Sequence, residues 1–230
     1  MAEHDHSEHE LAWALNGSIV IETRDAHWTV DMTQALWIPR GVAHTVHRRS
    51  GALIFPVFLP PGSAGDPVGR VATVTRSSEI RQLVDVCLQQ LLIGRALPAA
   101  ATKELLDAIG RHAQPNGGLA LPRDALARTV ATELLRSPAC SHTLTEWAGL
   151  LHTSAKTLQR RFQSETGSSF AQWRRRARLM AAQTLLAHGQ NVTAVAGETG
   201  FSTPSAFIQA FRREYGLTPH RYRAATTLLS

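Results

Sequence analysis

The chain has 230 residues, of which 43% are hydrophobic and 18% charged, a composition that excludes a largely disordered protein. The net charge of +6 is unevenly placed: residues 141–230 hold 11 Lys or Arg against 4 Asp or Glu, whereas residues 1–140 hold 13 against 14. A basic C-terminal block beside a neutral N-terminal block predicts that one domain binds a polyanion, for which nucleic acid is the first choice. The other domain is then expected to have a different task.

Two cysteines, Cys87 and Cys140, form neither a disulfide framework nor a zinc-binding pattern, and the chain opens with no basic-apolar leader and contains no run of 18 apolar residues. We therefore expect a cytoplasmic protein with reduced thiols and no membrane partner. Cys87 falls on an apolar helical face, which favours a small core residue over a redox sensor.

Short runs rich in Val, Ile, Trp and Phe predict six strands in the first quarter of the chain. Asn16-Gly17 is the strongest hairpin signal among them, because a type I′ turn needs positive φ at both central residues. Further turn signals are Pro39-Arg40-Gly41 and Ser50-Gly51. A sandwich or a small barrel follows from strands over residues 11–16, 18–23, 27–31, 35–38, 42–48 and 52–59.

The pattern becomes helical after a connection rich in Pro and Gly at residues 60–69. Apolar residues recur at helical spacing from Ile80 to Leu91, and this stripe is either domain core or a homodimer contact. A second helix is expected over residues 99–113, before the interruption at 115–118. A third is expected from Pro122, which suits a first helical turn, to residues 137–138.

A helix-turn-helix unit is predicted from Thr143 onward. Thr143 and Glu146 form a capping arrangement, and Ser154 is a good N-cap for the next helix. That second helix places Leu158 and Phe162 on one side, because successive residues are about 100° apart. The opposite side offers Lys156, Gln159, Arg160 and Gln163, which can read base edges because Gln matches adenine and Arg matches guanine.

A similar unit follows a helix predicted over residues 170–188. Phe207 and Phe211 anchor its reading helix, whose outward side carries Ser205, Gln209 and Arg212. The repeat is what argues against a merely solvated polar face. The connecting helix is about 30 Å long, close to one turn of duplex, so that the two reading helices can enter adjacent major grooves. It also carries arginines suited to phosphate contacts, with a structural or solubilising role as the alternative: Arg174, Arg175, Arg176 and Arg178.

These residues closely resemble the signature of the AraC/XylS transcriptional regulators over about residues 142–224. The resemblance implies a two-unit grip on double-stranded DNA, with the first reading helix the more discriminating, and RNA polymerase as a partner. The family's base-facing positions fall on Lys156, Gln159 and Arg160, and on Pro204, Ser205, Ala206 and Gln209. The matching motifs are Leu158-x-Arg160-x-Phe162-x4-Gly167, Val192-x2-Val195-Ala196-x2-Thr199-Gly200-Phe201-Ser202 and Phe207-x3-Phe211-Arg212-Arg213-x2-Gly216-Leu217-Thr218-Pro219-x2-Tyr222-Arg223.

The N-terminal segment holds a candidate metal site. His4, His6 and Glu10 share one face of an extended strand by their even spacing, and a later antiparallel strand can bring His44 alongside them. Imidazole and carboxylate ligands suit iron, manganese, nickel or zinc. The pattern resembles the two motifs of cupin barrels, which often form the sensing domain in the AraC group. A divalent metal, a metal-free pocket for an organic effector and a merely structural barrel all stay open.

We therefore predict an α+β chain with a cupin-like sensing β-barrel over residues 1–60, a linker and helical segment at 61–138 and an all-α DNA-binding domain at 139–225. The predicted function is sequence-specific transcriptional regulation, without enzymatic activity, in response to a small molecule or a metal ion. Two alternatives remain. One is a cupin metalloenzyme, an oxygenase or isomerase, with an appended DNA-binding domain, and the other is an architectural DNA-binding protein without sequence preference.

Overall fold

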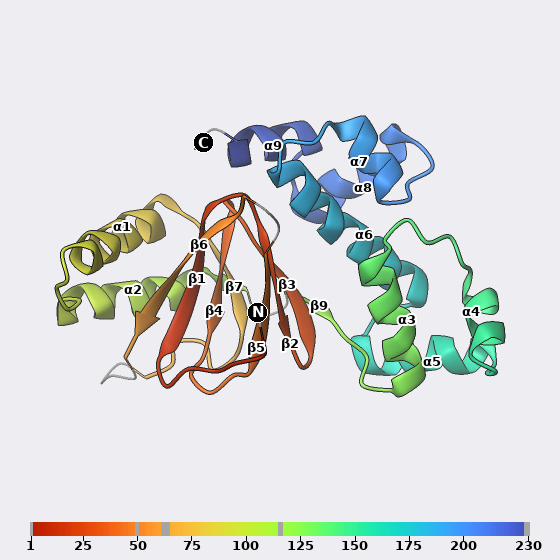
Figure 1. Cartoon of the computed structure of the whole chain (residues 1–230), viewed down its shortest axis with the longest axis horizontal. Coiled ribbons are helices and arrows are strands. Elements are labelled where there is room, and N and C mark those ends of the chain that lie inside the picture. The colour runs from red at the N-terminus through yellow and green to blue at the C-terminus, as the bar shows by residue number, and fades with distance from the viewer. Residues whose placement is uncertain (1, 49–50, 61–64, 115–116, 228–230) are drawn as a thin grey trace. The chain divides into compact units, whose positions relative to one another are not determined.

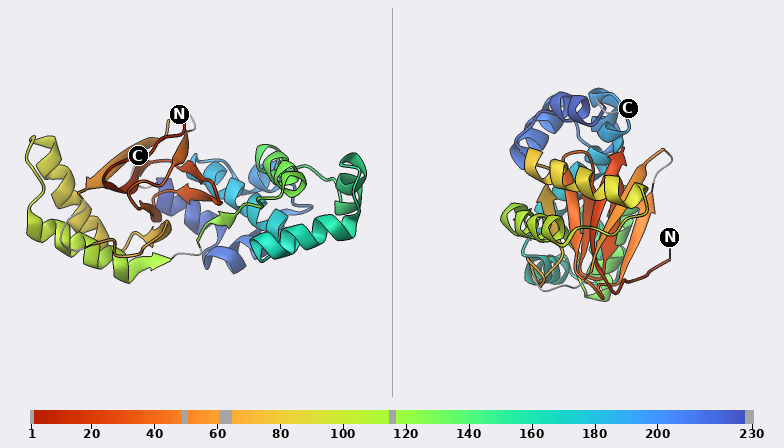
Figure 2. Two further views of the ribbon diagram at one scale, coloured as in Figure 1. Left: turned by 90° about the horizontal axis from the view of Figure 1, so that it is seen from below. Right: turned by 90° about the vertical axis from the view of Figure 1, so that its left-hand side faces the viewer.

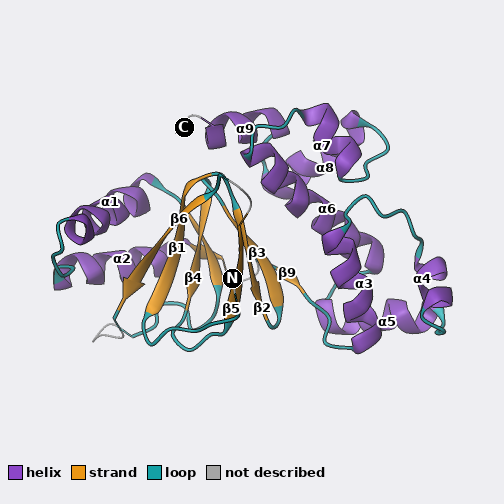
Figure 3. Ribbon diagram, viewed as in Figure 1, coloured by secondary structure: helices purple, strands orange, loops and turns teal. Residues whose placement is uncertain are grey.

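The computed structural model describes residues 2–48, 51–60, 65–114 and 117–227. Contacts divide the chain into two compact units: unit 1 holds residues 2–24 and 28–118, and unit 2 holds residues 25–27 and 119–227. Strands dominate the first half of the chain and helices the second (Figure 3). The predicted α+β class is confirmed at this level.

The described strands form two sheets (Figure 1). The strand β1 (His9–Asn16) pairs antiparallel with β4 (Gln34–Ile38) on one side and with β6 (Leu53–Leu59) on the other. The first sheet has the order β6-β1-β4-β7-β8, and the second has the order β5-β2-β3-β9. The remaining strands are β2 (Ile19–Thr23), β3 (Ala26–Val30), β5 (His44–Arg48), β7 (Ala72–Thr75), β8 (Ala113–Gln114) and β9 (Leu119–Ala120).

All six predicted strands are present, but the hairpin at Asn16-Gly17 is wrong. Gly17 has a φ of 67°, whereas His152 is the one non-glycine residue with positive φ in the described part of the chain, so Asn16 does not complete a type I′ turn. β1 and β2 belong to different sheets, and Gly17 lies in the connection between them. Ser50, residues 61–64 of the Pro- and Gly-rich connection, and residues 115–116 of the later interruption lie outside the described residues.

The helices α1 (Ser78–Leu92) and α2 (Ala99–His112) pack on the first sheet, and the right-hand view of Figure 2 shows them in front of its strands. Ile80, Val84 and Cys87 are completely buried in one cluster with sheet residues such as Trp37. The apolar stripe is therefore core over these positions, and these three side chains are not available to a second subunit. The exposed large apolar side chains of α1 are Val86, between Val84 and Cys87, and Leu91 and Leu92 at the C-terminal end, where Leu92 is 80% exposed.

Unit 2 is organised around α6 (Phe170–Ala187), which contributes to two separate apolar clusters. Trp173 packs with Leu158 and Phe162 in the first cluster, whereas Leu186 packs with Phe207 in the second. The other helices of this unit are α3 (Ala125–Arg136), α4 (Leu144–Leu150), α5 (Ala155–Thr166), α7 (Val192–Glu198), α8 (Pro204–Tyr215) and α9 (Pro219–Thr227).

Local capping signals fix most helix starts as expected. Thr143 and Glu146 form a reciprocal capping box, and the Ser154 hydroxyl accepts a hydrogen bond from the Thr157 N–H at 3.0 Å. The predicted start of the third helix at Pro122 is wrong, because Asp124 is the N-cap and accepts hydrogen bonds from the N–H groups of the first turn. The strand β7 and the helix α9 were not predicted.

The contact boundary between Gly118 and Leu119 differs from the predicted domain limits. It falls there because α1 and α2 share the core of the first sheet, and α3 shares a cluster with α5 and α6. The prediction that the segments divided at residues 60 and 138 have separate functions stays a prediction.

The turns of the helix pairs α4–α5 and α7–α8 have matching geometry. The Thr153 N–H donates to the Ala148 carbonyl, and the Phe201 N–H donates to the Ala196 carbonyl, each at 2.9 Å. The residue before each donor has positive φ, 50° for His152 and 76° for Gly200. The two pairs thus reverse the chain in the same way, although only the second uses glycine at the left-handed position.

We expect Gly200→Ala to lower the free energy of unfolding of unit 2 by about 3 kcal/mol. A Cβ at Gly200 would lie 2.9 Å from the Ala139 Cα, and an L-residue is strained at this φ. Gly189→Ala is the matched control, because its φ is 83° but nothing lies within 4 Å of the added carbon; it should cost only about 1 kcal/mol. Urea unfolding of the full chain, followed by far-ultraviolet circular dichroism, measures both, and equal losses would contradict the close contact at Gly200.

Candidate functional site

The helix α5 presents a polar face held outward by two buried anchors. Leu158 and Phe162 are completely buried, so the opposite side of the helix points away from the core. Lys156, Arg160 and Gln163 are exposed and Gln159 is half-buried, and all four line one shallow surface groove. The structure therefore brings the four predicted residues of the first reading helix together.

The polar side of α8 has the same arrangement around Phe207 and Phe211, which are completely buried. Ser205, Gln209 and Arg212 are exposed, as predicted. Ser205 and Gln209 flank Phe207 as Lys156 and Arg160 flank Leu158. α5 and α8 therefore place polar side chains at equivalent positions, but the residue types at these positions differ.

The arginines of α6 separate into different roles. Arg175 is exposed, with no recorded partner in the described part of the chain, and is free to meet a phosphate. Arg174 is half-buried: its Nη1 donates to the His142 carbonyl at 2.9 Å, and its guanidinium lies 5.1 Å from the centre of the Phe170 ring. Arg176 forms an ion pair with Glu214 at 3.0 Å. Arg178 donates all its hydrogen bonds to main-chain carbonyls. The sequence left phosphate contact and a structural role open for the run as a whole, and the division among its members was missed.

A short main-chain bridge assembles the N-terminal histidines. The His4 N–H donates to the His44 carbonyl at 3.0 Å, and the His44 N–H donates to the His4 carbonyl at 2.9 Å. The Gly41 N–H also donates to the His6 carbonyl at 2.9 Å. The expectation of one continuous strand carrying His4, His6 and Glu10 is wrong, because the chain bends before β1 begins at His9.

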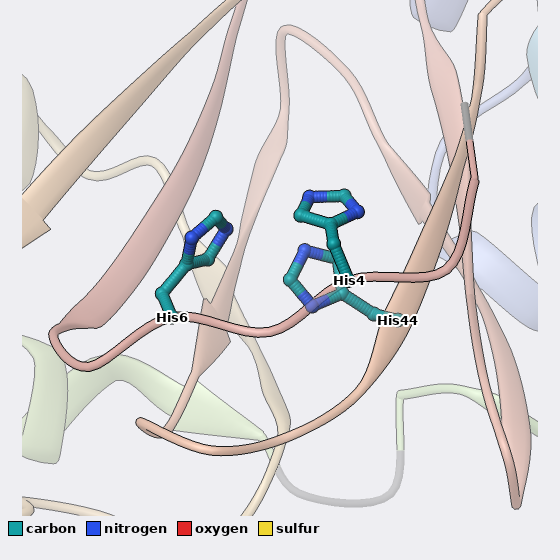
Figure 4. A group of neighbouring side chains, drawn as sticks. All are labelled: His4, His6 and His44. Carbon is teal, nitrogen blue, oxygen red and sulfur yellow. The ribbon is translucent and has the colours of Figure 1, made fainter.

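The four predicted ligand residues nevertheless lie together. One ring nitrogen from each of His4, His6 and His44 falls within 4.8 Å of the others, and the three rings face a common space (Figure 4). The Glu10 Oε2 lies 3.3 Å from the Nε2 atoms of both His6 and His44. Glu10 and His44 are buried, 4% and 1% exposed, whereas His4 and His6 are half-buried. His9 lies apart from this group: its Nδ1 accepts from the Arg40 N–H at 3.2 Å.

The contact between Glu10 and His44 requires a cation. The His44 Nδ1 donates to the Val42 carbonyl at 2.9 Å, so a neutral ring turns the lone pair of Nε2 toward the carboxylate. Neither the Glu10 Oε2 nor the His44 Nε2 has a hydrogen-bond partner, and two acceptors at 3.3 Å repel each other unless a proton or a metal ion lies between them. Burial alone would lower the pKa of His44, but the Glu10 carboxylate and the Val42 carbonyl outweigh it and the pKa is raised.

The donor set also fits a divalent metal. Three imidazoles and one carboxylate are typical ligands of first-row divalent ions. The Nδ1 atoms of His4 and His44 donate to carbonyls, at 3.0 Å for Ala2 and 2.9 Å for Val42, which leaves Nε2 of each ring as the ligand atom. Such outer hydrogen bonds orient metal-binding histidines in known sites.

Among the described residues, no helix combines the length and apolar character that a bilayer crossing requires. The two helix pairs instead define a class of DNA-binding protein: a family model described as "Helix-turn-helix domain" matches residues 147–225.

Similar proteins extend this likeness over the whole chain. The HTH-type transcriptional regulator NimR of Escherichia coli (strain K12) is 31% identical over 229 residues, which are 99% of this chain and 84% of NimR. The chain belongs to the AraC family of DNA-binding transcriptional regulators.

Two further similarities cover smaller shares. The HTH-type transcriptional regulator RipA of Corynebacterium diphtheriae is 30% identical over 212 residues, 92% of this chain and 59% of RipA. A solved structure of the DNA-binding domain of AdpA, a global transcriptional factor, in complex with a target DNA has 38% identity and a TM-score of 0.41, and covers 44% of this chain and 92% of that one.

We expect Arg175→Ala to weaken binding to all DNA sequences similarly and to flatten the dependence of log affinity on log salt concentration by about one unit. The reason is that Arg175 is exposed on α6 and has no partner among the described residues. Fluorescence anisotropy over a salt series measures both effects. Arg95→Ala is the control, because it removes the same charge from an exposed position in unit 1 and should leave the slope unchanged. An unaltered slope for Arg175→Ala would remove this residue from the interface.

Proposed function

We propose that this regulator grips DNA with two helix-turn-helix units, α4–α5 and α7–α8, and that its cupin-like unit 1 senses an effector that controls this grip. The observation that supports the two-unit grip is the matched turn geometry of the two pairs, each with a polar helix face turned outward by buried anchors. RNA polymerase is the downstream partner in this proposal, recruited or excluded at the promoter.

The first unit carries most of the sequence selection. Arg160 can donate two hydrogen bonds to guanine, and Gln159 can pair with adenine, while Lys156 serves either a base or a phosphate. The Gln163 Nε2 donates to the Gly167 carbonyl at 3.1 Å, which leaves its oxygen and one amide hydrogen for a base. In the second unit Ser205, Gln209 and Arg212 make the contacts, with Pro204 and Ala206 offering no side-chain donor.

Phosphate contacts then position these helices. Arg175 is the candidate from α6. Arg174 acts through the segment before α4, because its guanidinium already holds the His142 carbonyl.

The effector that we assign to unit 1 is a divalent metal ion held by His4, His6, Glu10 and His44. The facing acceptors of Glu10 and His44 favour a cation over a neutral organic molecule. A bound ion would supply a fixed positive charge that joins the N-terminal segment to β5. If a homodimer forms, its apolar contact is the end of α1 at Leu91, Leu92 and Ile93, since the rest of that stripe is core.

Arg160→Ala should reduce affinity for the cognate site by about 1–3 kcal/mol and relax the preference at one base pair. The variant and the parent chain are compared on the selected site, on each single-base substitution of it and on random duplex. An equal loss on random duplex would show that Arg160 contacts phosphate. The parent chain itself tests the regulator proposal: a flat preference across all duplexes would contradict it.

His44→Ala in untagged protein should abolish stoichiometric binding of Zn²⁺, because one of the three imidazoles is lost and Glu10 is left without its buried partner. Dialysis against Zn²⁺ followed by metal analysis measures the bound ion, and circular dichroism checks that the helices stay folded. His47→Ala is the control, since His47 is exposed on the same strand and pairs with Glu22. Full retention of the ion by His44→Ala would discard this ligand set.

A further inference from the structure

Among the described residues of unit 2, apolar side chains form two separate clusters, one in each half. The cluster around Phe162 and the cluster around Phe211 have no residue in common, and each lies against its own part of α6. Apolar packing therefore stabilises each helix pair separately. The orientation of one pair relative to the other must come from α6 itself and from polar contacts that span both halves.

Arg178 makes such contacts with all three of its guanidinium nitrogens. Nε donates to the Pro138 carbonyl at 2.9 Å, and Nη2 donates to the Cys140 carbonyl at 3.0 Å. Both carbonyls belong to the segment that leads into the N-cap of α4. Nη1 donates to the Gly200 carbonyl at 2.8 Å, in the turn between α7 and α8. One side chain thus binds the entry of the first pair and the turn of the second.

The surroundings make this contact specific for arginine. The Arg178 guanidinium is half-buried, and no carboxylate contacts it in the part of the chain that the structure describes. Burial and the neighbouring Arg174 lower its pKa, yet a guanidinium stays charged at neutral pH. Its planar fork fixes the directions of three acceptors, which a lysine ammonium cannot reproduce.

The main chain at Gly200 lies close to both Arg178 and the segment before α4. A Cβ at this position would lie 2.9 Å from both the Arg178 Cζ and the Ala139 Cα. The glycine lets the second turn approach the guanidinium and the segment before α4 at once. A shift of either partner would therefore disturb the other.

We propose that Arg178 is a positioning residue that locks the orientation of α8 relative to α5 and so sets the spacing of the two DNA boxes that the chain accepts. It touches protein carbonyls, not DNA, and acts through the two reading helices. This inference rests on the proposed two-unit grip. Moving one box by one base pair rotates it by about 35° around the duplex, which a locked pair of reading helices cannot follow.

The test measures affinity of the full chain for duplexes that carry the two boxes recovered by selection from a random pool. One series holds the recovered spacing, the spacing lengthened by one base pair and the spacing shortened by one, and a further duplex carries the first box alone. The parent chain should lose at least about tenfold in affinity when the spacing changes. Arg178→Ala should bind the recovered spacing about tenfold more weakly and show almost no spacing preference, while its binding to the single box and its salt slope stay unchanged.

Two variants separate positioning from stability. Arg174→Ala removes a hydrogen bond to the same segment but none to Gly200, so it should keep the spacing preference. Arg178→Lys retains the charge and should fold, yet it should lose most of the preference because it cannot hold three carbonyls. Undiminished spacing preference in Arg178→Lys or Arg178→Ala overturns the assignment alone. A parent chain that binds one box as tightly as two overturns the two-unit grip, and the assignment with it.

Discussion

Unit 2 depends on one helix with two unrelated apolar faces. Trp173 of α6 packs in the first cluster and Leu186 packs in the second. α5 and α8 therefore pack against different parts of the same helix. Its 18 residues rise by about 27 Å, on the order of one turn of duplex. The length of α6, a local property of the chain, therefore sets how far apart the two polar faces lie, whereas their mutual orientation also depends on the long-range contacts of Arg178.

The arginines of α6 make different contacts because they point in different directions around the helix axis. Arg174 and Arg178 are four residues apart, lie on one side and hold the segment before α4. Arg175 is rotated by about 100° from Arg174 and meets solvent, and Arg176 is rotated further and pairs with Glu214. Basic composition alone therefore overestimates the number of charges available to a phosphate backbone.

Local signals allowed much of the fold and the outward polar faces of α5 and α8 to be predicted. The capping box at Thr143 and the buried pair Leu158 and Phe162 act within a few residues, and the helices they define are present. The pairing of strands that are far apart in the sequence could not be predicted from such local signals. Asn16-Gly17 has the composition of a hairpin turn, yet the strands on either side join different sheets, because pairing with β4 and β6 satisfies β1 instead. The roles of the α6 arginines depend on carbonyls far away in the sequence, so a sequence pattern could not separate them.

The four side chains of the histidine group could be named from the sequence, but their arrangement could not. Residue type and the cupin-like spacing were enough to select His4, His6, Glu10 and His44, but the even spacing placed them on a strand that does not exist. What joins them is the main-chain bridge between His4 and His44. Under the proposed sensing function this difference matters, because a site built from a bridge and a strand end is held by few backbone hydrogen bonds and would gain order when a cation binds. A proton between Glu10 and His44 satisfies two of the four side chains, whereas a metal ion could satisfy all of them. The two occupants would therefore hold the N-terminal segment to different extents, and this is the difference that the proposed sensor would report.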